Sequence, residues 1–349
     1  MFRSLVLCLT LIVGAGLTGL AQTAPAADET LKISTELVLL DVQVLARQTG
    51  QSVSGLRAED FTVYEGGVKQ SIEHFSYDRL PLSVVLLIDV SGSVLPLVER
   101  LQQRAQQALE KLRLEDEVAM LAFSKEVWLT QDFTRDRTAL FRALQDLGTG
   151  AYLERGKKLN AASGGPTAIG EGLYYAASHL LAAAQPRQRR AILIITDNLP
   201  NDTKPPHSRA EISAQLLDAG AVLHALIVDN TSSKAAKAAR YSPLNILTEK
   251  VIFKSAGNVN GYVEQTGGQM LAANQEDAGT KMAAMLEQLR ARYSIGYTPA
   301  NAEFDGRFRK LKLKVSRQAE AAHGRLLLKT RQGYLAKPPA ERQTVTPNH

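Results

Sequence analysis

The strongest constraint on the fold is a set of uninterrupted apolar runs in the middle of the chain. They cover residues 82–88, 118–123, 191–195 and 221–228. Runs without polar alternation are typical of strands buried on both faces, as in parallel sheets. Between them, apolar residues recur every three or four positions, which predicts helices. This strand–helix alternation predicts a doubly wound, mostly parallel α/β domain over residues 80–292.

The segments on either side of this domain have a different apolar pattern. Apolar and polar residues alternate from Val38 to Val44 and again over residues 310–315, and a period of two indicates half-buried strands. Each flank has about three such strands, which is marginal for a stable sheet in water. We therefore expect residues 33–79 and 293–336 to join in one discontinuous β-sandwich, with the α/β domain inserted in it.

The first 21 residues have the features of a secretory signal peptide. Arg3 precedes an apolar stretch that ends in small residues before Gln22, and we expect cleavage after Ala21. An uncleaved membrane anchor is the alternative. After cleavage, no remaining segment is expected to insert in a membrane. The interpretation places the protein outside the cytoplasm, in the periplasm, on the cell surface or secreted.

The remaining terminal segments and the composition narrow the functional class. Residues 22–32 and 337–349 are expected to be disordered. The only cysteine, Cys8, lies in the signal peptide, so disulfides, thiol catalysis and cysteine-ligated zinc are excluded from the mature chain.

The distribution of charge excludes a further class. The net charge is +6, but the basic residues are scattered and aromatic residues make up only 6%, which does not indicate nucleic-acid binding. The basic cluster Arg187, Arg189 and Arg190 is interpreted as a solvated turn before a strand.

Oxygen-bearing side chains stand where the predicted strands end. Asp89, Ser91 and Ser93 alternate after the first apolar run, Asp197 follows the third, and Thr167 lies in a glycine-rich loop between them. The carboxyl ends of parallel strands form the ligand-binding edge of such sheets, so these side chains are expected to meet there. Hard oxygen ligands suit Mg²⁺, Mn²⁺ or Ca²⁺ rather than zinc or copper. For residues 89–93 alone, a plain turn closing a strand is the alternative.

The order of these three motifs resembles the metal-ion-dependent adhesion site of the von Willebrand factor type A domain. The resemblance implies that Ser91, Ser93 and Thr167 ligate the metal directly. It also implies that Asp89 and Asp197 act mainly through bound water, and that one position stays open for an acidic group of a partner.

Two departures from the family pattern affect these loops. Asn198 stands where the family usually has glycine, and asparagine tolerates left-handed backbone better than most residues. An insertion at residues 151–163 precedes Thr167 and so bears on the geometry of the loop that carries this residue. We expect the insertion to tune the choice of partner, with a tolerated mobile loop as the alternative.

The flanks resemble the segments that surround this domain in a bacterial VWFA-related family, and the resemblance covers roughly residues 33–335. It implies an exported bacterial protein that binds partners through a metal. It rests on the segments 55–67, 293–299, 305–309 and 331–334.

Taken together, the sequence predicts a non-enzymatic, divalent-cation-dependent binding protein. Its expected cofactor is Mg²⁺, with Mn²⁺ or Ca²⁺ as alternatives, and its expected partner is a protein with an exposed Asp or Glu. A metal-assisted hydrolase is an alternative, although no general base is tied by motif to the loops. A structural module with a vestigial site is another. The sequence sets neither the partner's identity nor the oligomeric state.

Overall fold

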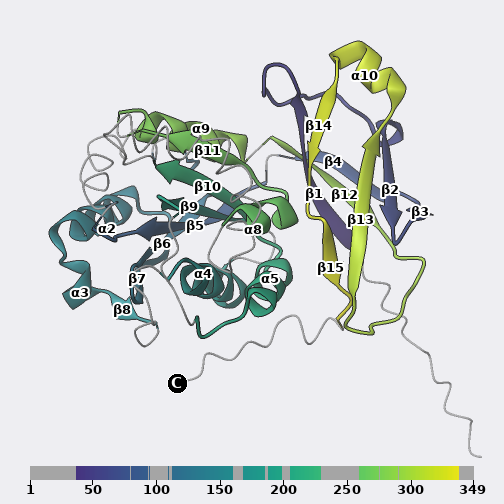
Figure 1. Ribbon diagram of the computed structural model, residues 1–349. Helices are drawn as coiled ribbons and strands as arrows, with labels where there is room; N and C mark the ends of the chain where they lie inside the picture. Colours follow the sequence, from purple (N-terminus) through teal and green to yellow (C-terminus); the bar gives the residue numbers. More distant parts are fainter. Residues whose placement is uncertain are drawn as a thin grey trace, which may run out of the picture. The chain divides into compact units, whose positions relative to one another are not determined.

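The computed structural model describes eleven parts of the chain, and its strands form one seven-stranded and two four-stranded sheets (Figure 1). Several predicted features lie outside the described residues: Ser93, Thr167, the signal peptide and lead-in, and most of the helix expected between the first two apolar runs. The residues that the structure describes are 37–78, 80–92, 94, 109, 112–159, 168–184, 188–198, 205–228, 259–274, 276–289 and 291–337.

The seven-stranded sheet is built on the apolar runs, with the order β11-β10-β9-β5-β6-β7-β8. All eight residues of the central strand β5 are buried, which explains why its sequence does not alternate. The neighbouring pairs from β11 to β6 are parallel, whereas β7 runs antiparallel to both of its neighbours, β6 and β8. The predicted doubly wound, mostly parallel sheet is confirmed. The strands are β5 Leu82–Asp89, β6 Glu117–Phe123, β7 Val127–Thr134, β8 Lys157–Lys158, β9 Arg189–Thr196, β10 Val222–Val228 and β11 Met270–Ala273.

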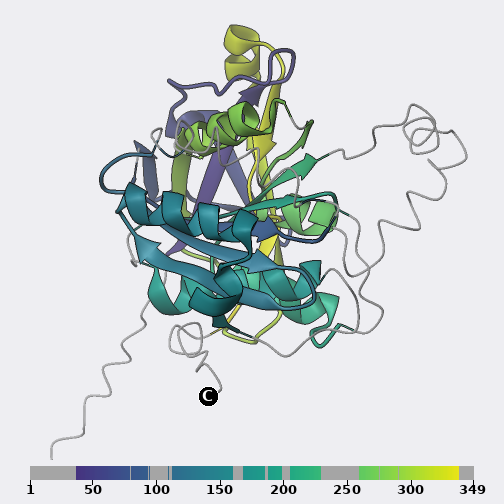
Figure 2. The ribbon, with the colours of Figure 1, turned by 90° about the vertical axis from the view of Figure 1, so that its left-hand side faces the viewer.

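Helices cover both faces of this sheet (Figure 1, Figure 2). One face of β5, including Leu86, packs in a core with α2 and α9, and the other face, including Leu87, packs with α4, α5 and α8. No helix among the described residues is long and apolar enough to cross a membrane. The helices are α2 Arg137–Thr149, α4 Ile169–Ala183, α5 Arg209–Asp218, α8 Val259–Thr266 and α9 Ala278–Gln288.

The two four-stranded sheets combine strands from both flanks, as the alternating segments predict. Their orders are β14-β1-β12-β4 and β15-β13-β2-β3, and they enclose one core that includes Val42, Val63 and Tyr293. The discontinuous β-sandwich is therefore confirmed. Two short helices within the flanks were not predicted, η1 Ala58–Asp60 and α10 Arg317–His323. The strands are β1 Val38–Ala46, β2 Phe61–Glu65, β3 Val68–Gln70, β4 His74–Asp78, β12 Arg292–Tyr297, β13 Phe308–Val315, β14 Leu326–Lys329 and β15 Gly333–Leu335.

The described part of the predicted insertion, residues 151–159, extends the edge of the seven-stranded sheet. It forms the helical turn α3 Tyr152–Arg155 and the strand β8, which pairs with β7. Tyr152 packs edge-on against Trp128 with ring centroids 6.2 Å apart. This part of the insertion is thus held by strand pairing and an aromatic contact, and its effect on partner choice stays a prediction.

Buried polar contacts connect the seven-stranded sheet with the sandwich, and the described residues of both belong to one compact unit. Arg292, only 1% exposed, places Nη2 3.1 Å from His224 Nε2 and Nη1 3.8 Å from Asp41 Oδ2. Burial lowers the pKa of His224 well below its usual value, so the neutral ring accepts this hydrogen bond. Arg189 Nε lies 3.6 Å from Asp41 Oδ1, which makes Asp41 a bridge between β9 and β12.

The predicted solvated turn at the basic cluster is therefore wrong for Arg189 and Arg190. They are the first residues of β9, Arg189 is only 8% exposed, and Arg190 is half-buried. The prediction failed because it placed the start of the strand after the arginines. Arg187 lies outside the described residues.

Candidate metal site at the carboxyl edge of the sheet

Asp89 is the last residue of β5, and its side chain is fully buried. The Ser91 backbone N–H donates to Oδ1 at 2.9 Å, and the Thr196 hydroxyl donates to Oδ2 at 2.7 Å. One donor comes from the loop after β5 and the other from the end of the neighbouring strand β9. Both carboxylate oxygens are thus fixed in direction by two separate segments.

The loop after Asp89 is a tight turn. The bond from Ser91 N–H to the Asp89 carboxylate is the pattern of an Asx turn, and Val94 N–H donates to the Ser91 carbonyl at 2.9 Å. The local turn chemistry considered as the alternative is therefore present. A turn alone does not require the contact with Thr196. That contact ties Asp89 to the end of β9, directly before Asp197.

The loop that carries Asp197 follows β9. Asp197 is 5% exposed, and Asn198 has a φ of 57°. Among the described residues, Asn198 is the only one other than glycine with a positive φ. The prediction that asparagine replaces glycine in left-handed backbone is therefore confirmed. Asn198 Oδ1 also accepts a hydrogen bond from Val259 N–H at 3.2 Å, so its side chain holds the start of α8, which glycine could not do.

The electrostatics of this edge favour a cation. Burial raises the pKa of Asp89 to about 6, against the lowering effect of the hydrogen bonds from Ser91 and Thr196. The negative charge of Asp197 raises it further. Two carboxylates thus share one buried edge, and the side chains predicted to bind a metal there all offer oxygen atoms. Such a donor set fits a hard divalent ion, which would offset both charges.

Of the five predicted ligands, the structure describes Asp89, Ser91 and Asp197 and places them at the same edge. Thr167 falls outside the described residues, but the next residue, Ala168, donates its N–H to the Ser124 carbonyl at 2.7 Å, just after β6. In the described part of the chain, no three His, Cys, Asp or Glu side chains gather as a metal group. The predicted set contains only two carboxylates, so it depends on its hydroxyl ligands.

Thr196 is a functional candidate that the sequence reasoning missed. Its hydroxyl donates to Asp89 Oδ2 and accepts the N–H of Asn198 at 3.1 Å. It therefore positions the carboxylate of one loop and the backbone of the other. The available signal was a hydroxyl residue directly before the strand-end aspartate.

Glu65 is another buried carboxylate, and it lies in the sandwich core. The sequence reasoning did not predict that it forms the centre of a polar cluster. The Tyr297 and Tyr334 hydroxyls donate to Oε2 at 2.6 and 2.9 Å, and Arg309 Nη1 donates to Oε1 at 3.2 Å. Burial, followed by the contact with Glu65, raises the pKa of Tyr297 far above its usual value. These four residues all belong to the flank segments that carry the family resemblance, and the structure shows that they form one cluster.

Residues 84–199 match the family model described as von Willebrand factor type A domain. No curated protein matches the chain.

Similar solved structures include the conserved hypothetical protein BatB from Bacteroides thetaiotaomicron, which is 16% identical with a TM-score of 0.40 and covers 60% of this chain and 98% of that one. Another is proximal thread matrix protein 1 from the mussel byssus with a zinc-occupied MIDAS motif, at 14% identity and a TM-score of 0.40, covering 62% and 49%. A third is the SpRpn10 VWA domain, at 13% identity and a TM-score of 0.34, covering 60% and 95%. As the family match over residues 84–199 shows, the chain contains a von Willebrand factor type A domain.

Proposed function

We propose that this chain is an exported protein that captures an acidic side chain of a protein partner through a divalent cation, with Mg²⁺ as the expected ion. The observation that carries the proposal is the Asp89 carboxylate. It is buried, fixed by one donor from the loop after β5 and one from the end of β9, and placed beside a second acid. A cation would complete this arrangement and give the type A domain its adhesive function.

The proposed roles follow from the chemistry of the side chains. Ser91, Ser93 and Thr167 would supply neutral hydroxyl ligands, whereas Asp89 and Asp197 would act through bound water. Neutral inner ligands leave the ion with most of its positive charge, so it stays a strong acceptor for an incoming carboxylate. Thr196 would hold Asp89 in the orientation that this arrangement needs.

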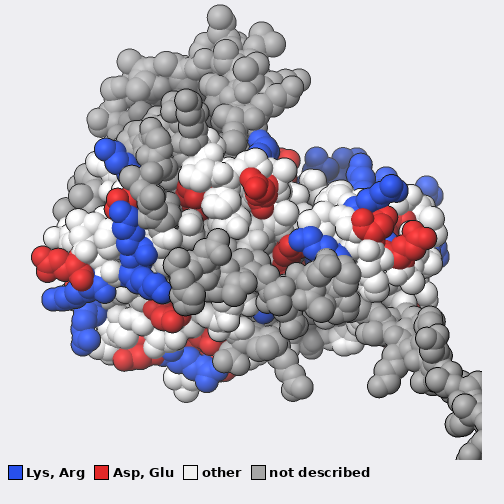
Figure 3. All heavy atoms as spheres, turned by 90° about the horizontal axis from the view of Figure 1, so that it is seen from below, with Lys and Arg blue, Asp and Glu red and all other residues white. Residues whose placement is uncertain are grey.

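The distribution of surface charge gives a further indication about specificity. On the face shown in Figure 3, basic and acidic side chains of the described residues are interspersed. Mixed charge of this kind gives little long-range attraction for one class of partner. The proposal therefore assigns specificity to the cation and to the loops around it, including the insertion beside Thr167.

Export rests on the signal-peptide features of residues 1–21. Secretion assays of the full chain would test it directly. We expect the mature protein to begin at Gln22 and to be recovered outside the cytoplasm. Recovery of the full-length chain in the membrane fraction would favour the uncleaved anchor instead.

The decisive experiment titrates Mg²⁺ and Mn²⁺ into the wild type and Asp89→Asn by calorimetry. Asp136→Asn is the matched control, because Asp136 accepts the Thr138 N–H at the start of α2 and asparagine caps helices equally well. We expect the wild type and the control to bind metal and Asp89→Asn to lose binding. Absence of binding by the folded wild type would overturn the proposal.

Two further measurements separate adhesion from the alternatives. Affinity capture with and without a chelator should recover a partner only when the cation is present. A panel of esters and phosphate esters should show no turnover. Hydrolysis that disappears in Asp89→Asn would favour the hydrolase, and metal binding without any cation-dependent partner would favour the vestigial module.

A further inference from the structure

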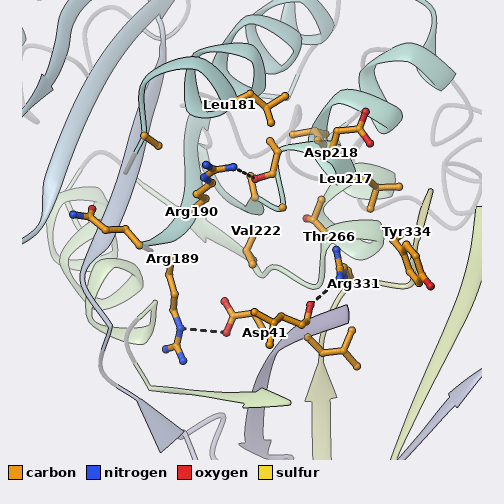
Figure 4. A pocket seen from close by; sticks show the side chains of 18 of the residues that line it. Asp41, Leu181, Arg189, Arg190, Leu217, Asp218, Val222, Thr266, Arg331 and Tyr334 are labelled. Atoms are coloured by element: carbon orange, nitrogen blue, oxygen red, sulfur yellow. Dashed lines mark hydrogen bonds and ion pairs between the residues drawn. The ribbon is translucent and has the colours of Figure 1, made fainter. Parts of the chain in front are cut away.

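A cavity of about 1000 Å³ lies where the sandwich meets the amino ends of the parallel strands (Figure 4). Its walls come from the start of β1 and from the segment leading into β15 on one side. On the other side they come from the start of β9, the end of α4, and the turn between α5 and β10. Asp89 lies at the opposite, carboxyl end of β5, so this cavity is separate from the candidate metal site.

The acidic groups in the cavity wall are already balanced. Asp41 lies between Arg189 and Arg292, at 3.6 and 3.8 Å. Asp218 is paired with Lys337. Both acidic residues of the wall therefore have basic partners within the chain.

Arg190 differs from these groups. Its Nη1 donates to the Ala219 carbonyl at 3.2 Å, and among the described residues it has no acidic partner. Burial lowers its pKa, but a guanidinium group stays charged at any physiological pH. The wall thus presents a half-buried positive charge without a counter-ion, which is costly unless something compensates it.

The remainder of the wall combines polar groups with apolar side chains. Leu39 and Leu80 line the cavity and are nevertheless 53% and 36% exposed. Leucine side chains left exposed inside a cavity are available to contact an apolar ligand. The apolar wall includes Leu37, Leu39, Leu80, Leu181, Leu217 and Val222.

We propose that this cavity binds a single-chain amphipathic carboxylate of the fatty-acid type, with its carboxylate on Arg190 and its hydrocarbon chain along the leucines. The guanidinium group of Arg190, close to exposed leucines in the same wall, calls for a ligand with a negative charge and an apolar body. An extended peptide fits less well, because it would need partners for its backbone groups. The Leu39 carbonyl on this side of β1 already accepts Arg331 Nη2 at 2.7 Å. The proposal goes beyond cation-dependent adhesion and does not depend on it.

The test is calorimetric titration of the full chain with octanoate below its micellar concentration, in the presence of a chelator. Octan-1-ol, which has the same chain length without the charge, is the ligand control. We expect octanoate to bind with a stoichiometry of one, and octanol to bind at least about tenfold more weakly, as the loss of a charge-assisted hydrogen bond implies.

Variants test the role of Arg190. Arg190→Gln should weaken octanoate at least about tenfold, whereas Arg190→Lys should keep most of the affinity because it keeps the charge. Arg142→Gln, on α2 and outside the cavity wall, should bind like the wild type. Asp89→Asn should also bind octanoate normally, which separates this site from the metal site. Equal affinity for octanoate and octanol, an unaffected Arg190→Gln, or no binding at all would overturn the proposal.

Discussion

Glu65 in the sandwich and Asp89 in the α/β domain are both buried carboxylates, but their charges are balanced differently. Glu65 accepts hydrogen bonds from two tyrosines and from the guanidinium group of Arg309. Asp89 accepts from a backbone N–H and a hydroxyl, both neutral, and has an acid, Asp197, as its charged neighbour. Glu65 is therefore neutralised by the chain itself, whereas Asp89 leaves a negative charge for something outside the chain to balance. The first arrangement serves folding, and the second suits binding.

The largest effect is expected at Glu65. Replacing it by glutamine removes the negative charge opposite Arg309, whose side chain is only 9% exposed. Removal of one partner of a buried ion pair typically costs about 3–5 kcal/mol. We expect Glu65→Gln to lower the free energy of unfolding in urea by about that amount.

Glu73→Gln is the control for this substitution. Glu73 is an exposed glutamate of the same sandwich that accepts the Thr298 hydroxyl at 2.8 Å, and its loss should cost less than about 0.5 kcal/mol. If the two variants were equally stable, Glu65 would not be balanced as the structure indicates.

Substitution of Asp89 is expected to change the free energy of unfolding in the opposite direction, as long as no metal is bound. Its pKa in the folded protein, about 6, lies above the ordinary value of 3.8. Its contribution to stability is therefore fully present below about pH 4 and is lost as pH rises through about 6. At pH 7 the ionised group opposes folding, so Asp89→Asn should raise the free energy of unfolding of the metal-free protein by about 1–3 kcal/mol.

Thermal unfolding with and without Mg²⁺ checks this prediction. Mg²⁺ should raise the melting temperature of the wild type and leave Asp89→Asn unchanged, because only the wild type binds the ion. A destabilised Asp89→Asn at pH 7 would mean that Asp89, like Glu65, is balanced within the fold.

The pH dependence of metal binding sharpens the same contrast. Below about pH 6, a cation must displace a proton from Asp89, so affinity should fall by up to about tenfold per pH unit as the pH is lowered. Mg²⁺ titrations from about pH 5 to about pH 8, a range that brackets the Asp89 pKa of about 6, would measure it. An affinity that stayed constant across this range would exclude Asp89 from the ion's surroundings.

A smaller effect is expected at Thr196. Thr196→Val removes the hydroxyl that donates to Asp89 Oδ2 while keeping the shape of the side chain. Loss of such a supporting hydrogen bond should weaken metal binding by about tenfold. Thr130→Val on β7, which removes a hydroxyl bonded to the Met120 carbonyl of β6, should leave metal affinity unchanged. Equal metal affinities of the two variants would show that Thr196 does not position Asp89.

An effect on stability rather than on metal affinity is expected at Asn198, where the contributions of backbone and side chain can be separated. Asn198→Ala removes the bond to Val259 N–H and keeps the left-handed backbone, which should cost about 1–2 kcal/mol. Asn198→Gly loses the same bond but relieves the backbone, so it should stay within about 0.5 kcal/mol of the wild type. Urea unfolding of both variants would measure this, and equal losses would assign the whole effect to the side chain.

Much of the fold follows from local patterns in the sequence. The continuous apolar runs specify strands buried on both faces, and the alternating flanks specify strands with one buried face. These patterns also place Asp89 and Asp197 at strand ends, and therefore at one edge of a parallel sheet. Neighbouring residues determine such patterns, so the sequence by itself determined the two kinds of sheet and the edge that carries the candidate site.

The pairing of polar groups was decided only by the tertiary structure. Arg309 and Glu65 are 244 positions apart, Thr196 and Asp89 are 107 apart, and Arg189 meets Asp41 across the boundary between sheet and sandwich. Nothing in the neighbouring sequence shows whether an arginine faces solvent or a buried carboxylate, because burial depends on segments that meet only when the chain folds. For this reason Arg189 and Arg190 were expected in a solvated turn, and instead they begin β9 and line a cavity.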